Sequence, residues 1–347
     1  MGNPACWTQL HARVHQTLKR DRLLEPHERV LLAISGGQDS LCLLQLLCDL
    51  QPKRWGWQLA IAHCDHRWSG DEDLADRVRQ IAGQWELPFH QRTAPPLPAT
   101  EAAAREWRYR ALVEIAQSEG FSAIATGHTQ SDRAETLLYN LVRGSGPDGL
   151  QALGWQRSLA AGIRLVRPLL GIGRAETGTF CQQNQLPVQS DPANRDRRYA
   201  RNRIRADLVP YLQAQLNPNV ETTLAQTAEI FRAEVAHLER EADALLQQAL
   251  PGEPSPPQRL DRRPLHSAPL ALQRRVMRAF LQRVLARAPT FEQIEELTRL
   301  IEAPNRTRTA SLPVGAAARP PAELPRQRPA PAATHAEVDG DWICLKR

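Results

Sequence analysis

Residues 30–40 constrain the fold of this 347-residue chain more than any other stretch. The apolar run from Val30 to Ile34 is long enough for a buried strand of a parallel sheet. It stops at Ser-Gly-Gly, where glycine permits a sharp turn and lets a ligand approach the backbone. From Asp39 to Leu50 the apolar spacing predicts a buried helix. A strand, a glycine turn and a helix start in this order aim free N–H groups at one position, which predicts an anion site.

Two common nucleotide-binding patterns are absent from this stretch. A Walker A loop needs Lys followed by Ser or Thr, and a dinucleotide loop needs G-x-G-x-x-G. The sequence Ser-Gly-Gly-Gln-Asp-Ser at 35–40 instead resembles the pyrophosphate-binding loop of the N-type ATP pyrophosphatases, which cleave ATP between its α and β phosphates. The loop therefore predicts an ATP site, and an ordinary strand-to-helix turn is the alternative.

Strand and helix patterns alternate through the first 145 residues. We expect strands at 30–34, 58–62, 88–92 and 121–126, and helices at 39–50, 71–86, 101–118 and 131–143. This alternation predicts an α/β fold, with a parallel sheet and helices on both faces. Because ligands of such folds bind at the carboxyl ends of the strands, the loops at 35–40, 63–66 and 127–132 should converge.

Two of these loops carry side chains suited to chemistry. His63-Cys64-Asp65-His66 fits a neutral turn beside a nucleotide, with metal binding as the less favoured alternative. His128, Asp132 and Glu135 share one face if a helix begins near residue 128, and a His and an Asp at such a helix start can hold Mg²⁺ and a triphosphate. The alternative is that Asp132 is only a favourable first-turn charge and His128 a solvated loop residue.

Arginine supplies almost all of the positive charge, and the net charge of +6 fits a polyanionic partner. Arg105, Arg108 and Tyr109 share a face of the helix at 101–118, which suits a phosphate or base platform. A solvated charged face, with Arg105 paired to Glu101, is equally compatible with the spacing.

A second group of arginines lies between residues 195 and 205, where six of them surround Tyr199. Such density raises affinity for phosphates. Asp191, Asp196 and Asp207 lie close by, so a structural network of ion pairs remains open.

The remaining chain is expected to be mostly helical. Helices are predicted at 220–250, 268–287 and 291–302, a flexible linker at 317–333, and a short hairpin at 337–345. We expect an α/β domain at 1–216, a smaller all-α domain at 217–310, and a Pro/Ala/Arg-rich linker with a short tail at 311–347. The six cysteines form no C-x-x-C pair or zinc spacing, and no signal peptide or membrane span is apparent, so we expect a soluble cytoplasmic protein.

Taken together, the motifs resemble those of the tRNA(Ile)-lysidine synthetases, a family of the PP-loop (N-type ATP pyrophosphatase) superfamily. The resemblance covers roughly residues 25–215. Besides the loop at 35–40, it rests on Glu-Ala-Ala-Ala-Arg-Glu-Trp-Arg-Tyr at 101–109, Gly-His-Thr-Gln-Ser-Asp-Arg-Ala-Glu-Thr at 127–136, Arg-Gly-Ser-Gly at 143–146, Arg-Pro-Leu-Leu at 167–170, and the arginine-rich stretch at 191–205.

The resemblance implies an adenine nucleotide alpha hydrolase-like catalytic domain followed by a helical domain that binds tRNA. It implies a ligase that adenylates the 2-carbonyl oxygen of the wobble cytidine in a tRNA(Ile) with a CAU anticodon. Free L-lysine then displaces AMP and leaves lysidine. ATP, Mg²⁺, lysine and this tRNA are the implied partners, no membrane is involved, and a homodimer is one open oligomeric state.

The resemblance also assigns roles to individual residues of this chain. The implied catalytic residues are Asp39, Arg105, His128 and Asp132, and Asp39 and Asp132 are the implied Mg²⁺ ligands. The implied ATP-binding residues are Ser35, Gly36, Gly37, Gln38, Asp39, Ser40 and His63. The implied tRNA-binding residues are Arg108, Tyr109, Arg143, Arg198, Arg201, Arg203 and Arg205.

One position departs from the family pattern. The family carries two adjacent acidic residues in the fourth loop, and the first of these is Ser131 here, which puts an accessory contact in doubt. Two other functions remain as alternatives: a tRNA thiolase of the same superfamily, and a non-catalytic RNA-binding protein with a vestigial ATP loop. A thiolase needs catalytic cysteine pairs, which the cysteine spacing argues against.

Overall fold

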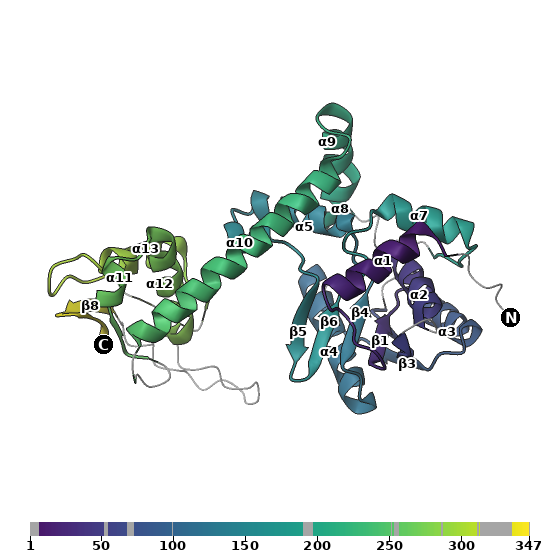
Figure 1. The fold of residues 1–347 in the computed structure, drawn as a ribbon, viewed down its shortest axis with the longest axis horizontal. Coiled ribbons are helices and arrows are strands. Elements are labelled where there is room, and N and C mark those ends of the chain that lie inside the picture. Colours follow the sequence, from purple (N-terminus) through teal and green to yellow (C-terminus); the bar gives the residue numbers. More distant parts are fainter. Residues whose placement is uncertain are drawn as a thin grey trace. The chain divides into compact units, whose positions relative to one another are not determined.

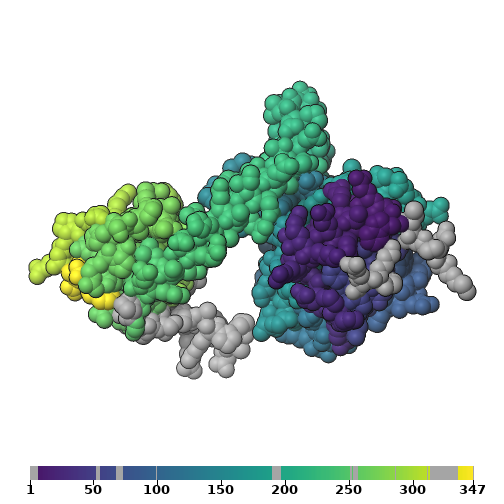
Figure 2. All heavy atoms as spheres, viewed as in Figure 1, coloured from purple at the N-terminus to yellow at the C-terminus, as the bar shows by residue number. Residues whose placement is uncertain are grey.

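A computed structural model gives the fold of the chain (Figure 1). It describes residues 7–51, 55–67, 73–98, 100–189, 197–250, 252, 257–285, 287–310, 312 and 335–346. The chain divides into two compact units, residues 1–232 and 233–347. The atoms of the first unit, coloured from purple to teal, form one closely packed body in Figure 2.

The first unit is built on a six-stranded sheet with the order β3-β2-β1-β4-β6-β5. Its strands are β1 (Arg29–Ala33), β2 (Gln58–Asp65), β3 (Phe89–Thr93), β4 (Ala123–Thr126), β5 (Gln156–Ala160) and β6 (Ile163–Val166). All neighbouring strands are parallel except β5, which pairs antiparallel with β6. The four predicted strands are confirmed, and the β5–β6 pair extends the sheet beyond them.

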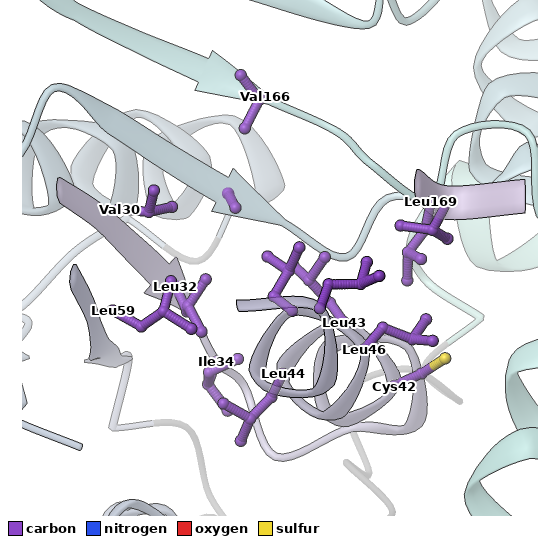
Figure 3. Close-up of a cluster of buried hydrophobic side chains, with 14 of the residues drawn as sticks. Val30, Leu32, Ile34, Cys42, Leu43, Leu44, Leu46, Leu59, Val166 and Leu169 are labelled. Carbon is purple, nitrogen blue, oxygen red and sulfur yellow. The ribbon is translucent and has the colours of Figure 1, made fainter. Parts of the chain in front are cut away.

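Helices cover both faces of this sheet, as predicted. On one face Val30 and Leu32 of β1 pack into a core with α1 (Gln9–Arg20), α2 (Gln38–Leu50), α3 (Leu74–Gln84) and α7 (Arg174–Gln183). Figure 3 shows Leu43, Leu44 and Leu46 of α2 beside these strand residues. On the other face Leu31 packs with α4 (Glu101–Glu119). Successive residues of β1 therefore serve opposite cores, as the two-residue period of a strand requires.

The remaining helices of the first unit lie along the carboxyl edge of the sheet and beyond it. They are α5 (Gln130–Val142), α6 (Pro147–Leu150), α8 (Ala200–Arg203), a π-helical turn η3 (Ile204–Leu208), α9 (Val209–Gln215) and the start of α10 (Val220–Ala249). Leu138 of α5 packs against Ile204 and Val209 in a small separate core. This contact fixes the arginine-rich segment beside the start of α5.

The second unit is mostly helical. We predicted an all-α domain at 217–310, but the unit also contains a small sheet. Besides the end of α10 it contains α11 (Arg263–His266), α12 (Leu270–Val284) and α13 (Phe291–Arg299). It also contains an antiparallel sheet of β7 (Arg259–Asp261), β9 (Trp342–Lys346) and β8 (His335–Asp339). The predicted closing hairpin is confirmed as β8–β9.

The hairpin belongs to the core of the second unit, whereas we expected a separate tail after residue 311. Ala336, Val338 and Ile343 are fully buried in one apolar cluster with Phe280 and Leu297. The division between the units also falls inside α10, after residue 232, and not at residue 217. The reason is that the first turns of α10 contact α5 and its neighbours. Within the described residues, no helix is both long and apolar enough to cross a membrane.

The two site-bearing loops meet at Gly127. A Cβ at this position would lie 2.7 Å from the carbonyl oxygen of Asp39 and 2.9 Å from the nitrogen of Ser40. We therefore predict that Gly127→Ala separates the two loops and lowers the free energy of unfolding by about 1–3 kcal/mol, because backbone atoms cannot move aside like a side chain. Thermal or urea denaturation measures this loss.

Gly83→Ala is the matched control, since a Cβ at Gly83 within α3 would meet nothing within 4 Å. It should leave stability unchanged or raise it by roughly 0.5–1 kcal/mol. Equal stability of the two variants would contradict the close approach at Gly127.

Candidate active site

The loop after β1 presents unsatisfied backbone amides. Gly36 adopts a left-handed backbone conformation, φ +82°, and Gly37 caps α2 without a side chain. The hydroxyl of Ser40 donates to the carbonyl of Gly37 at 2.8 Å and lies 3.3 Å from that of Ser35, which closes the turn. The first N–H groups of α2 are thus left for a ligand, and the helix dipole favours an anion there.

Asp39 lies in the first turn of α2 and is held from α7. Thr177 Oγ1 donates to one carboxylate oxygen at 2.5 Å, and Arg174 Nη1 lies 3.3 Å from the other. Burial raises the pKa of Asp39, although Arg174 and Thr177 oppose it. Asp39 was expected from the sequence. Its two partners were not, because they lie more than 130 residues further along the chain.

Asp132 opens α5 and is fully engaged by its neighbours. One carboxylate oxygen accepts hydrogen bonds from the N–H and hydroxyl of Thr129, at 2.8 and 3.0 Å. The other lies 3.1 Å from Arg201 and 3.2 Å from Arg205. Burial alone would raise the pKa of Asp132, but Arg201, His128 and Arg205 outweigh it and lower the pKa to about 2.

Glu135, one turn after Asp132, completes an ion network. Its carboxylate lies 3.2 Å from Arg201 and 2.6 Å from Arg205. His128 precedes this helix, and its Nδ1 lies 2.8 Å from Thr126 Oγ1. Burial lowers the pKa of His128 well below its ordinary value, so the imidazole is neutral near pH 7. Asp132 and Glu135 therefore share a face that Arg201 and Arg205 occupy, whereas His128 lies before the helix.

His63, Cys64 and Asp65, which we expected in a turn, instead form the end of β2 and pair with β3. His63 is buried, with Nδ1 2.9 Å from the carbonyl oxygen of Ile34, and burial lowers its pKa. Burial likewise lowers the pKa of His66 to about 4 and raises that of Cys64 to about 12. In the described part of the chain, no three His, Cys, Asp or Glu side chains are grouped to hold a metal ion. The turn predicted from residue 63 is therefore wrong in its position, because β2 continues through His63 and Cys64 to Asp65.

These loops surround one cavity of about 340 Å³. The cavity gathers most of the residues expected from the sequence: Ser35, Gly37, Gln38, Asp39, Ser40, His63, Arg105, Arg108, His128, Asp132, Arg201 and Arg205. It sits where β1 and β4 run side by side and their connections diverge, which is the usual ligand position in such sheets.

Five expected residues do not line the cavity. Gly36 forms the turn after β1. The Tyr109 ring on α4 lies beneath the guanidinium groups of Arg105 and Arg108. Arg143 donates to the Tyr139 hydroxyl at 2.6 Å near the far end of α5. Arg203 donates to the carbonyls of residues 197 and 198, and Arg198 itself is exposed.

Comparison with known proteins identifies the family. Residues 7–212 match the model of the PP-loop domain, and residues 260–319 match that of the TilS substrate binding domain. The tRNA(Ile)-lysidine synthase of Nostoc sp. is 53% identical over 98% of this chain and 97% of its own length. The chain belongs to the tRNA(Ile)-lysidine synthase family.

Other relatives agree with this assignment. The lysidine synthase of Synechocystis sp. is 54% identical over 88% of this chain and 94% of its own, and the chloroplastic one of Zygnema circumcarinatum is 34% identical over 83% and 79%. Among solved structures, the U34-tRNA thiolase NcsA from Methanococcus maripaludis with its [4Fe-4S] cluster superposes with a TM-score of 0.55. It has 18% identity over 65% of this chain and 78% of that chain, which shows a shared fold alone.

The ion network around Asp132 should make the stability of the protein depend on pH in the acid range. Because the pKa of Asp132 lies below its unfolded value, its stabilisation is present above about pH 4 and lost as pH falls to about 2. The expected contribution is on the order of 2 kcal/mol. Denaturation curves of the wild type and Asp132→Asn should therefore converge as pH falls through this window. A stability difference that does not change with pH would refute the ion pairs.

Proposed function

We propose that this member of the family ligates lysine to the 2-carbonyl carbon of the wobble cytidine in a tRNA(Ile) with a CAU anticodon. ATP is consumed and AMP and diphosphate are released. The observation that carries this proposal is the cavity in which the amides of the β1–α2 turn face the start of α5. A phosphate-binding turn opposite charged side chains suits adenylation of a bound base.

In the first step the cytidine 2-carbonyl oxygen attacks the α-phosphorus of ATP, and the bond to diphosphate breaks. This oxygen is a weak nucleophile, so the site has to stabilise charge on the phosphates and hold both reactants in place. Ser35 and the N–H groups of residues 37–40 would bind the leaving diphosphate. Arg105, which lines the cavity without a carboxylate partner among the described residues, would stabilise charge at the α-phosphate.

Asp39 and Asp132 would hold a magnesium ion in this cavity. Proteins bind Mg²⁺ through about one or two carboxylates together with substrate phosphates. Both carboxylates line the cavity, and the ion would replace Arg201 and Arg205 at one oxygen of Asp132. When bound, the ion would neutralise phosphate charge.

In the second step the ε-amine of lysine attacks the ring carbon, its proton is lost, and the bond from carbon to the AMP oxygen breaks. The neutral imidazole of His128 would hydrogen-bond the phosphate of the departing AMP. His63 would contact the nucleotide from the opposite wall of the cavity.

Of the proposed tRNA-binding residues, some have other partners in the structure. Arg201 and Arg205 are bound by Asp132 and Glu135, so we assign them to positioning the start of α5. Arg203 holds the turn before it through backbone carbonyls. Arg143 and Arg198 remain proposed contacts to tRNA.

The thiolase alternative lacks support from the thiols. Of the five cysteines in the described residues, Cys64 alone lines the cavity, and its pKa is raised to about 12. A sulfur-carrying cysteine acts as a thiolate, which this environment disfavours. A vestigial ATP loop is also disfavoured, because the amides of that loop and Asp39 are positioned for a ligand.

The decisive experiment incubates the protein with ATP, Mg²⁺, labelled lysine and the tRNA transcript. We expect base-resistant transfer of lysine to the tRNA with one AMP released for each lysine, since an amidine-type bond survives conditions that cleave an ester. A sulfur-dependent product would favour the thiolase, and tRNA binding without ATP turnover would favour the non-catalytic protein.

Asp39→Asn should abolish adenylation while preserving the fold. Burial already disfavours the charged form of Asp39, so a neutral amide of the same shape should cost little stability. We expect tRNA-dependent diphosphate release to fall about 100-fold or more, comparable to loss of one electrostatic contact in an active site.

Asp243→Asn, at an exposed position of α10, is the matched control and should retain full activity. Melting temperatures of both variants establish that they are folded. Wild-type rates for a folded Asp39→Asn protein would remove Asp39 from the mechanism.

A further inference from the structure

Three arginines lie over the ring of a single tyrosine beside the cavity, and the charge of a fourth acts on it. The guanidinium carbon of Arg157 lies 4.6 Å from the ring centroid of Tyr109, and those of Arg105 and Arg108 lie 5.3 and 5.5 Å from it. Arg167 also acts on this ring: burial would raise the pKa of Tyr109, but the charges of the four arginines together lower it. We call these five side chains the Tyr109 cluster.

Three separate segments build the Tyr109 cluster. Arg105, Arg108 and Tyr109 come from α4, whose Tyr109 ring packs on the sheet core near Leu159 and Ala160. Arg157 comes from the edge strand β5. Arg167 follows β6, is buried, and donates from Nη1 to the carbonyl of Gly154 at 2.6 Å. The cluster is therefore held by tertiary structure and is not a chance meeting of surface side chains.

The arginines of the Tyr109 cluster differ from the other arginines of the site in whether a carboxylate binds them. Arg174, Arg201 and Arg205 are each bound to a carboxylate, within 3.3 Å. Over the ranges that the structure describes, none of the four arginines around Tyr109 has a carboxylate within ion-pair distance. Burial, together with repulsion from neighbouring guanidinium groups, lowers the pKa of Arg105 and of Arg167.

Several neighbouring guanidinium groups without carboxylate partners among the described residues favour the binding of an anionic ligand. Stacking on an aromatic ring stabilises each cation while its N–H edge stays available, and the guanidinium fork matches two oxygens of a phosphate. The proposed function already assigns the ATP phosphates to the N–H groups at the start of α2. Arg105 and Arg108 line the cavity, whereas Arg157 is exposed on β5, so the cluster leads from the cavity to the surface.

We propose that Arg108 and Arg157, stacked on Tyr109 and backed by Arg167, bind a backbone phosphate of the RNA next to the nucleotide that enters the cavity. This site is distinct from the one that binds the ATP phosphates. The proposal rests on the proposed function for the identity of the RNA. It assigns Arg157 and Arg167, which no sequence motif had connected with Tyr109, to substrate binding.

Arg157→Gln tests the proposal in the full-length protein, because this exposed side chain can be replaced without disturbing the core. We expect binding of the unmodified tRNA transcript to weaken about tenfold. The slope of log affinity against log salt should become shallower by about 0.7–0.9, the value for one lost phosphate contact. The affinity for ATP alone should not change. Arg157→Lys should keep the salt slope but lose part of the affinity, since lysine retains charge without the fork.

Arg110→Gln is the matched control. Arg110 lies on the same helix as Arg108, is exposed, and pairs with Glu106 at 3.4 Å, so its replacement should leave tRNA binding and salt slope unchanged. An unchanged tRNA affinity for Arg157→Gln would overturn the proposal, as would weakened ATP binding with normal tRNA binding. If the wild type binds tRNA but transfers no lysine, the proposed function fails, while the difference between Arg157→Gln and Arg110→Gln still decides the phosphate site.

Discussion

The close approach of two backbones at Gly127 is the constraint on which the rest of the site depends. β1 and β4 are neighbours, but neighbouring strands alone do not bring a helix start and a loop into van der Waals contact. Contact requires a residue without a Cβ, because any side chain here would meet the backbone of Asp39 and Ser40. With glycine in place, the amides of α2 and the carboxylate of Asp132 line the same cavity, which makes one reaction centre from two distant motifs.

The arginines of the site fall into two groups, which differ in whether a carboxylate binds them. Those bound to Asp39, Asp132 and Glu135 fix the positions of the carboxylates and leave little net charge. Those around Tyr109 have no such partners among the described residues and carry their charge toward a ligand. The cavity thus combines arginines whose charge is balanced by carboxylates with arginines that have no carboxylate partner among the described residues. Neither group alone would serve both substrates, because balanced charges do not attract RNA and unbalanced ones would not hold carboxylates in place.

The features that could be predicted from the sequence are those that a local pattern or a motif determines. Of the four predicted strands, β1, β2 and β4 follow from apolar runs, whereas β3 has no such run. Part of the cavity lining follows from the carboxyl ends of the strands, and Arg105 and Arg108 come from α4. Partnerships over long separations were out of reach: Thr177 and Arg174 reach Asp39 from α7, and Arg157 reaches Tyr109 from a strand whose sequence has no apolar run. The all-α expectation for the second unit failed for the same reason, since β7 has three residues and pairs with a strand some 80 residues later.

Arg133 shows how α5 is tied to the rest of the first unit. It follows Asp132 but points away from the cavity, is buried, and lies 2.6 Å from Glu229 of α10. Trp155 Nε1 donates to the same carboxylate at 3.2 Å, and the carbonyl of Trp155 accepts from the N–H of Arg167 at 2.9 Å. Loss of Glu229 would leave the buried guanidinium of Arg133 without this partner, which is costly, so the pair specifies position. One network thus sets the start of α5, the first turns of α10 and the strands that carry Arg157 and Arg167. The reaction centre and the Tyr109 cluster are consequently fixed against each other by the same side chains.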